Sequence, residues 1–181
     1  GDGVDKVVLE GCEVKNTALA YGQIIAESII LSRCVAVDCG GFAKAEQTGS
    51  AWYLHRCRQV TGPAKRSALF VQASTVAATF YIRHSEMASY SSVSMSIIVN
   101  GAGLDMRYCQ VTPAAGGTWS TITANKDGPI LIQNCIVWSR GNGIYVKSDA
   151  IDITADNNLY YCDTNPTGSG TWATGGTRWN Y

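Results

Sequence analysis

A six-residue frame recurs along the chain and constrains the fold more than any other feature. Each copy has an apolar residue, two polar or turn residues, a small residue, one further residue and, usually, a second apolar residue. The small residue of the seven copies is Cys12, Cys34, Cys57, Ser85, Cys109, Cys135 or Asn158. These positions lie between 22 residues (Cys12 to Cys34) and 28 residues (Cys57 to Ser85) apart. Self-similarity at such a period is typical of a repeat architecture.

The residues around each frame predict two strands joined by a bend. Two positions before the leading apolar residue, every copy carries another apolar residue: Val7, Ile29, Trp52, Phe80, Leu104, Ile130 and Ile153. This period of two indicates a strand with one buried face. A two-residue interruption follows, which Asn134 and Asn157 suit because asparagine tolerates left-handed backbone angles. A third strand is predicted in most repeats, at 23–26, 68–71, 96–99, 120–123 and 143–146.

Three short strands per repeat predict one coil of a parallel β-helix. A single coil exposes both rows of its backbone hydrogen-bonding groups, so coils stack about 4.8 Å apart. Because crossovers between parallel strands are right-handed, we expect an all-β, right-handed parallel β-helix, a solenoid of about seven coils over residues 1–164. The fourth frame positions would stack inside it as a ladder, where cysteine acts as a small, buried hydrophobe. Residues 165–181 are expected to be a Trp- and Gly-rich tail packed as a loop, or alternatively an aromatic platform for sugars.

Composition narrows the classes of function. The chain has 181 residues, 46% of them apolar, which is enough for one continuous core. Its 14 basic and 14 acidic residues argue against a nucleic-acid binder, which would need a basic surface. The apolar runs are too short to cross a bilayer, so we expect no membrane insertion. Free buried thiols are favoured over disulfides, because five of the seven cysteines share one repeat position while Cys39 and Cys162 lie off it.

The beginning of the chain predicts a segment of a larger or processed protein. It opens with Gly1 and enters the strand at 6–9 without a preceding helix or secretion signal. Open solenoid ends carry unpaired strand edges, so end-to-end or side-by-side self-association is expected. No cofactor is predicted, since the segment Gly-Asp-Gly-Val-Asp at 1–5 is too short to define a calcium site and no zinc-like spacing occurs.

The pattern resembles a known family of repeat proteins. The Leu/Ile-x-x-Cys/Asn-x-Val rhythm, the Asn-bearing bends and the closing Asp-Asn-Asn-Leu-Tyr-Tyr at 156–161 look like the pectin-lyase-like superfamily of right-handed parallel β-helices. The likeness spans essentially the whole chain and rests on core and turn positions. That superfamily includes polysaccharide lyases, polygalacturonase-like hydrolases, bacterial surface proteins and phage tailspikes. The resemblance therefore implies the fold and an extracellular or virion-associated location, but it does not choose an activity.

The second and third frame positions place both histidines and four arginines on one outer stripe. In the central repeats these pairs are Ser32-Arg33, His55-Arg56, Arg83-His84 and Arg107-Tyr108. Arginine pairs bidentately with carboxylates, so Arg33, Arg56, Arg83 and Arg107, with Tyr108, are predicted to bind an acidic polysaccharide from a solvent-facing position. In a lyase, His84 or His55 would remove a proton beside a uronate carboxylate that an arginine neutralises.

Two alternatives to this site remain open. The arginines are equally compatible with solvated turn positions, because unit charges one rung apart repel by only about 1 kcal/mol in water. A hydrolase would need two carboxylates beside its substrate. Asp149, Asp152 and Asp156 cluster in the last full repeat, but Asp156 suits a turn better than an acid catalyst. Two functions are therefore predicted: polysaccharide recognition, with or without lyase activity, or a non-catalytic fibre or shaft segment.

Overall fold

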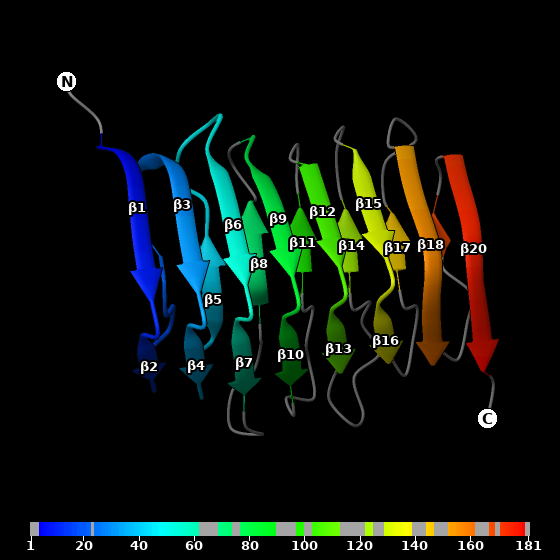
Figure 1. The fold of residues 1–181 in the computed structure, drawn as a ribbon, viewed down its shortest axis with the longest axis horizontal. Helices are drawn as coiled ribbons and strands as arrows, with labels where there is room; N and C mark the ends of the chain where they lie inside the picture. Colours follow the sequence, from blue (N-terminus) through cyan, green and yellow to red (C-terminus); the bar gives the residue numbers. More distant parts are fainter. Residues whose placement is uncertain are drawn as a thin grey trace.

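The chain forms a parallel β-solenoid. The computed structural model describes residues 4–22, 24–61, 69–73, 77–89, 97–99, 103–112, 122–124, 129–138, 144–146, 152–161, 167–168 and 171–179. Over these ranges all the elements are strands, every strand pairing is parallel, and the strands form two sheets. Figure 1 shows them side by side along one axis, with the N-terminal strands at one end and the C-terminal strands at the other. The predicted fold class is confirmed. In the part of the chain described, no helix long and apolar enough to span a membrane occurs.

The larger sheet contains two rows of strands, one on each side of a bend. The row before the bend consists of β1 (Val4–Glu10), β3 (Ala26–Ser32), β6 (Ala51–His55), β9 (Thr79–Arg83), β12 (Gly103–Arg107), β15 (Ile130–Gln133) and β18 (Asp152–Tyr161). The row after the bend consists of β2 (Glu13–Lys15), β4 (Val35–Val37), β7 (Arg58–Thr61), β10 (Glu86–Ser89), β13 (Gln110–Thr112) and β16 (Ile136–Trp138). The single strand β18 pairs with β15 of the first row and with β16 of the second. Each predicted frame therefore contributes to this sheet (Figure 1).

The smaller sheet lies behind the larger one and closes the coils (Figure 1). Its strands are β5 (Gly41–Lys44), β8 (Leu69–Ala73), β11 (Ile97–Val99), β14 (Ile122–Ala124), β17 (Ile144–Val146) and β19 (Thr167–Gly168). Four of the predicted third strands coincide with β8, β11, β14 and β17. The strand predicted at 23–26 is wrong, because Ile24 and Ile25 are not in a strand and Ala26 begins β3. Among the described residues, the first coil joins this sheet only by a Tyr21–Ala43 bridge. β5 was not predicted, because Gly40 and Gly41 at its start resemble a turn.

Strand register aligns the frames into columns. We call the part of one coil that lies in the larger sheet a rung. The leading apolar residues of the frames pair from rung to rung in the order Leu9, Leu31, Leu54, Ile82, Met106, Ile132 and Ala155. All of them are buried except Leu9, which is partly buried against the core. The number of coils differs from the prediction: within the described residues about four complete turns are present instead of about seven. A complete turn needs its connections as well as its strands, and several connections lie outside the described residues.

Large side chains stack between coils in the interior. Phe42 and Phe70 stack with ring centroids 4.8 Å apart, and Trp52 and Phe80 lie 5.9 Å apart. All four are fully buried. Burying a side chain of this kind contributes about 1.5–3 kcal/mol, so contacts within the lumen help to hold neighbouring coils together, beside the backbone pairing of the strands.

The predicted cysteine ladder is present. Cys34, Cys57, Cys109 and Cys135 are buried and free, whereas Cys12 in the first coil is half-buried and free. Cys39 is also buried, and its thiol donates to the carbonyls of Val14 and Val37. Cys162 lies outside the described residues.

The ladder residues also form hydrogen bonds to backbone groups at the bend. The Cys57 thiol donates to the carbonyl of Leu31 in the preceding rung, with an Sγ to O distance of 3.2 Å, and also contacts the carbonyl of His55 at 3.7 Å. In the last full rung, Asn158 takes the place of cysteine, donating to the carbonyl of Ile132 at 2.8 Å and accepting from the amide of Cys135 at 2.9 Å. Small polar side chains are therefore suited to this position, which explains why serine and asparagine occur in it.

The C-terminal tail differs from the loop that was predicted. β20 (Thr171–Trp179) pairs in parallel with β18 and adds another strand to the larger sheet. In this pairing Gly175 faces Asp156 and Gly176 faces Asn158, so the two glycines stand at the level of the bend. Threonine and glycine fill most positions of β20, which is why the apolar alternation was not visible. The domain boundary at residue 164 stays a prediction.

Candidate functional site

The third position has a left-handed backbone in each of the seven frames. The φ angles are 64° at Gly11, 54° at Arg33, 53° at Arg56, 51° at His84, 55° at Tyr108, 53° at Asn134 and 53° at Asn157. The bend predicted at Asn134 and Asn157 is confirmed. Left-handed geometry costs a residue with a Cβ atom about 1 kcal/mol, and glycine and asparagine adopt it most readily. The first rung and the last two use these two residues, whereas the four rungs between them carry Arg, Arg, His and Tyr.

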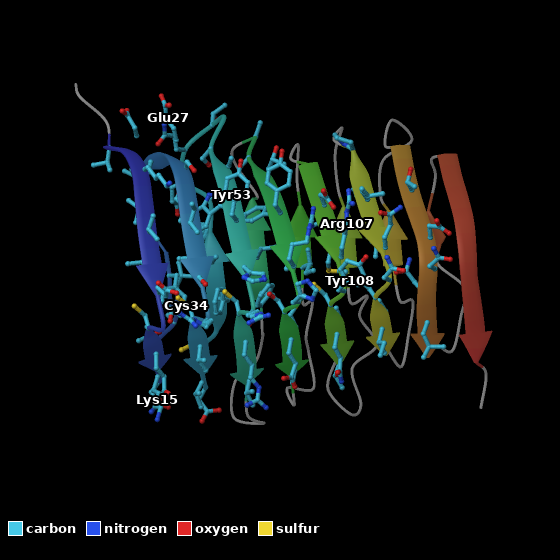
Figure 2. All side chains as sticks on the ribbon, in the orientation of Figure 1. Lys15, Glu27, Cys34, Tyr53, Arg107 and Tyr108 are labelled. Carbon is cyan, nitrogen blue, oxygen red and sulfur yellow. The ribbon has the colours of Figure 1, made fainter. Side chains whose placement is uncertain are left out.

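The side chains of these four rungs lie on the outer surface beside the bend. We use the name stripe for Arg33, His55, Arg56, Arg83, His84, Arg107 and Tyr108. Arg33, His55, Arg56 and His84 are exposed, and Tyr108 is 54% exposed. Figure 2 shows Arg107 at the end of β12 and Tyr108 at the bend that leads into β13.

Aromatic contacts connect neighbouring rungs of the stripe. His84 and Tyr108 stack with ring centroids 5.1 Å apart and planes 6° from parallel. His55 meets His84 edge to face, with centroids 5.6 Å apart and planes at 81°. The two predicted catalytic histidines are therefore in contact, and Tyr108 extends the group by one rung.

Arg83 and Arg107 are already paired with a carboxylate that the sequence analysis did not single out. On β12, Asp105 Oδ2 accepts from Arg83 Nη2 at 2.6 Å, and Oδ1 accepts from Arg107 Nε at 2.9 Å. Arg83 Nη1 also donates to the carbonyls of Ile82 and Asp105, at 3.0 and 2.6 Å. The Arg83 side chain is only 28% exposed, so it does not extend freely into solvent as predicted. Burial alone would raise the pKa of Asp105, but the hydrogen bonds from Arg83 and Arg107 outweigh it and lower this pKa.

The other arginines in and beside the stripe differ in their partners. Arg33 forms an ion pair with Glu10 of the preceding rung. Just beyond the bend, Arg58 Nε lies 2.9 Å from Glu86 Oε2. Arg56 is exposed, and the described residues provide no carboxylate partner for its guanidinium. Of the four arginines predicted to bind a polyanion, Arg56 therefore lacks a carboxylate partner among the described residues, and Asp105 balances one of the two charges of Arg83 and Arg107.

Desolvation and positive neighbours lower the pKa of His55. Desolvation, followed by the charges of Arg56, His84 and Arg33, lowers the pKa of His55 below its ordinary value of 6.5. His55 is therefore neutral at neutral pH, and its ring can accept a proton or a hydrogen bond. A neutral imidazole beside a guanidinium is an arrangement that suits proton abstraction next to a bound carboxylate.

A tyrosine pair lies on the same outer face, one column away from the stripe. Tyr53 and Tyr81 stack with centroids 4.9 Å apart and planes 9° from parallel, and Tyr53 is 41% exposed. In register they continue Val8 and Ile30 of the first two rungs. This column was not predicted from the sequence, although an aromatic residue at an outward strand position was a visible signal. Figure 2 shows Tyr53 on the outer side of its strand.

Other candidate residues are placed only in part. Asp149 lies outside the described residues, as do residues 1–3 of the segment weighed as a calcium site. Asp152 belongs to β18, but its side chain is not among those described. Asp156 is half-buried, and its Oδ2 accepts from Asn157 Nδ2 at 3.4 Å, which agrees with a role in the turn. Within the described ranges, no three His, Cys, Asp or Glu side chains come together in a way that could hold a metal ion.

Comparisons of the chain with protein-family models, with curated proteins and with solved structures gave no match. The fold is therefore assigned from strand topology, and any function must be argued from the surface itself.

Proposed function

We propose that this β-solenoid recognises an acidic polysaccharide along the stripe, as part of an extracellular or virion-associated protein. The observation that supports this most strongly is the backbone conformation of Arg33, Arg56, His84 and Tyr108. These residues occupy left-handed positions where Gly11, Asn134 and Asn157 occur in other rungs. Unfavourable backbone geometry gathers at sites where the side chain is needed. The repeat rhythm, which resembles the pectin-lyase-like superfamily, is consistent with a glycan ligand.

The exposed groups of the stripe match the chemistry of a glycan. Arg56 offers a guanidinium that can pair with a carboxylate or sulfate. Tyr108 and the histidines offer ring surface and hydrogen-bonding groups, which suit the apolar faces and hydroxyls of sugars. These groups come from neighbouring rungs, so a chain of sugars would contact them one after another.

A binding measurement with one variant and one matched control tests the proposal. Wild-type protein is screened against acidic polysaccharides, and the best ligand is measured by isothermal titration calorimetry. Arg56→Gln combined with Tyr108→Ala is expected to weaken binding at least about tenfold, since a charge-assisted hydrogen bond and a ring contact are lost. Arg58→Gln, which alters a neighbouring arginine paired with Glu86, should leave affinity within about twofold. Absence of binding to every polysaccharide would reject the proposal.

Lyase activity is a candidate extension of this function. The lowered pKa of His55, its contact with His84 and the adjacent Arg56 supply a base beside a cation. If lyase chemistry occurs, His55→Gln or His84→Gln should abolish the unsaturated product, detected by its ultraviolet absorbance, while weakening glycan binding far less. Binding without any absorbance change in the wild type would leave recognition as the function.

A structural fibre or shaft segment is the second candidate function. In the described residues, β1 pairs only with β3, and Val4, Val8 and Ile25 near this strand are 56%, 55% and 65% exposed. Exposed strand edges with apolar side chains favour pairing with further strands. Analytical ultracentrifugation over a range of concentrations tests this function: assembly that Val8→Lys weakens would support it, and a monomer at every concentration would oppose it.

A further inference from the structure

We infer that the stripe binds one isolated anionic group at Arg56, and that its ligand is a sparsely charged glycan rather than a polyuronate with a carboxylate on every sugar. This inference rests on the proposed glycan recognition and specifies the ligand. The anionic group is a carboxylate or a sulfate, because a guanidinium pairs with both.

The distribution of partners along the stripe supports this inference. Glu10 neutralises Arg33, and Asp105 holds both Arg83 and Arg107. Arg83 is held further by two backbone carbonyls, so it is not free to turn toward a ligand. Arg56 lies between these two groups and has no carboxylate partner among the described residues. Asp105 leaves its two arginines with a net charge of +1, but both guanidiniums are held by its carboxylate, so Arg56 is the stripe arginine that is free to pair with an anion.

The spacing of the rungs makes a densely charged ligand unfavourable. Rungs repeat about every 4.8 Å, which is close to the length of one sugar in an extended chain. A polyuronate lying along the solenoid would thus place a carboxylate near almost every rung. One or two rungs from Arg56, those carboxylates would meet the Glu10–Arg33 and Arg58–Glu86 ion pairs, which have no net charge. They would lose hydration there without gaining a guanidinium that is free to pair, so they would add little to the attraction gained at Arg56.

The groups around Arg56 suit the uncharged part of such a glycan. His55 and His84 lie in edge-to-face contact, and His84 stacks on the half-exposed Tyr108. These groups offer ring surface and hydrogen bonds without adding a fixed charge. One anion with neutral sugars on either side fits this arrangement.

Four oligosaccharide probes test the inference. They are tetragalacturonate, a neutral tetrasaccharide backbone with a single glucuronate branch, the same backbone with one sulfate, and the neutral backbone alone. Affinities are measured by calorimetry at several salt concentrations. The singly charged probes are expected to bind at least as tightly as tetragalacturonate and about tenfold more tightly than the neutral probe. Their log affinity should fall with log salt with a slope of about −1, as one ion pair requires.

Two variants make the test specific. Arg56→Gln should remove the difference between charged and neutral probes. The double variant Glu10→Gln/Arg33→Gln removes a paired arginine at the same left-handed position without changing net charge, and it should preserve that difference. Tighter binding of tetragalacturonate with a slope near −3 or steeper would overturn the inference, as would equal binding of neutral and charged probes. If no probe and no longer glycan binds, the proposed function itself fails.

Discussion

The imidazole ring of His84 lies flat against the phenol ring of Tyr108, and both residues have left-handed backbone angles. The contact exists because the bend repeats with the same geometry in each rung and presents its third residue at the same place. The backbone of the bend is therefore common to all rungs, while the identity of the side chain is free to vary.

Exchanging bend residues should change stability in opposite directions in different rungs. Arg56→Asn is expected to raise the free energy of unfolding by about 0.5–1 kcal/mol, because asparagine tolerates the left-handed conformation better than arginine. Asn134→Arg should lower it by a similar amount for the same reason. Chemical denaturation with urea measures both changes. If Arg56→Asn were as destabilising as Asn134→Arg, backbone conformation would not be the cause.

The ladder should tolerate a small polar group but not a charge. Cys57→Ser is expected to cost no more than about 2 kcal/mol, because a hydroxyl can donate to the carbonyls that the Cys57 thiol contacts, as Ser85 does to Arg83. Cys57→Asp should cost several kcal/mol, since it places a charge without a partner in the lumen. Urea denaturation of both variants at neutral pH tests this difference. Equal losses in the two variants would show that shape, and not charge, controls this position.

Asp105 should make stability sensitive to acid. Its pKa is lowered in the folded protein, so its contribution is present above its ordinary pKa of 3.8 and is lost as pH falls through the lower folded value. Asp105→Asn is expected to cost about 2 kcal/mol at pH 7, where the carboxylate accepts from both Arg83 and Arg107. The cost should shrink toward zero at a pH below the folded pKa. Urea titrations at a series of pH values check this, and a cost independent of pH would contradict it.

Buried thiols should make the fold sensitive to alkali. Burial raises the pKa of Cys57 from 9.0 to about 12. A folded pKa above the unfolded one gives a contribution that is complete below about pH 9 and is lost as pH rises toward 12. We therefore expect stability to fall steadily above pH 9, and less steeply in Cys57→Ser, which has no thiol to ionise there. Thermal melts between pH 8 and 11 provide the measurement. Identical slopes for the two proteins would show that another group controls the loss.

The sequence predicted the features that depend on apolar periodicity. Buried residues such as Leu54 and Ile82 alternate with outward ones, so the strands before the bend and the ladder were visible. β20 was missed because threonine and glycine carry no such alternation, and β5 because its glycines resemble a turn. The sequence also placed the stripe beside the bend. It did not reveal that Asp105 occupies two of the arginines, because that pairing depends on side-chain directions across neighbouring rungs.

The recurrence of one bend geometry from Gly11 to Asn157 makes each rung an interchangeable module. Cutting the chain at one ladder residue and rejoining it at the next would remove one whole turn while keeping the pleat, the handedness and the order of inward and outward positions. The length of the solenoid can therefore change by duplication or loss of single turns. Such a change would move the stripe along the axis without altering how its side chains are presented.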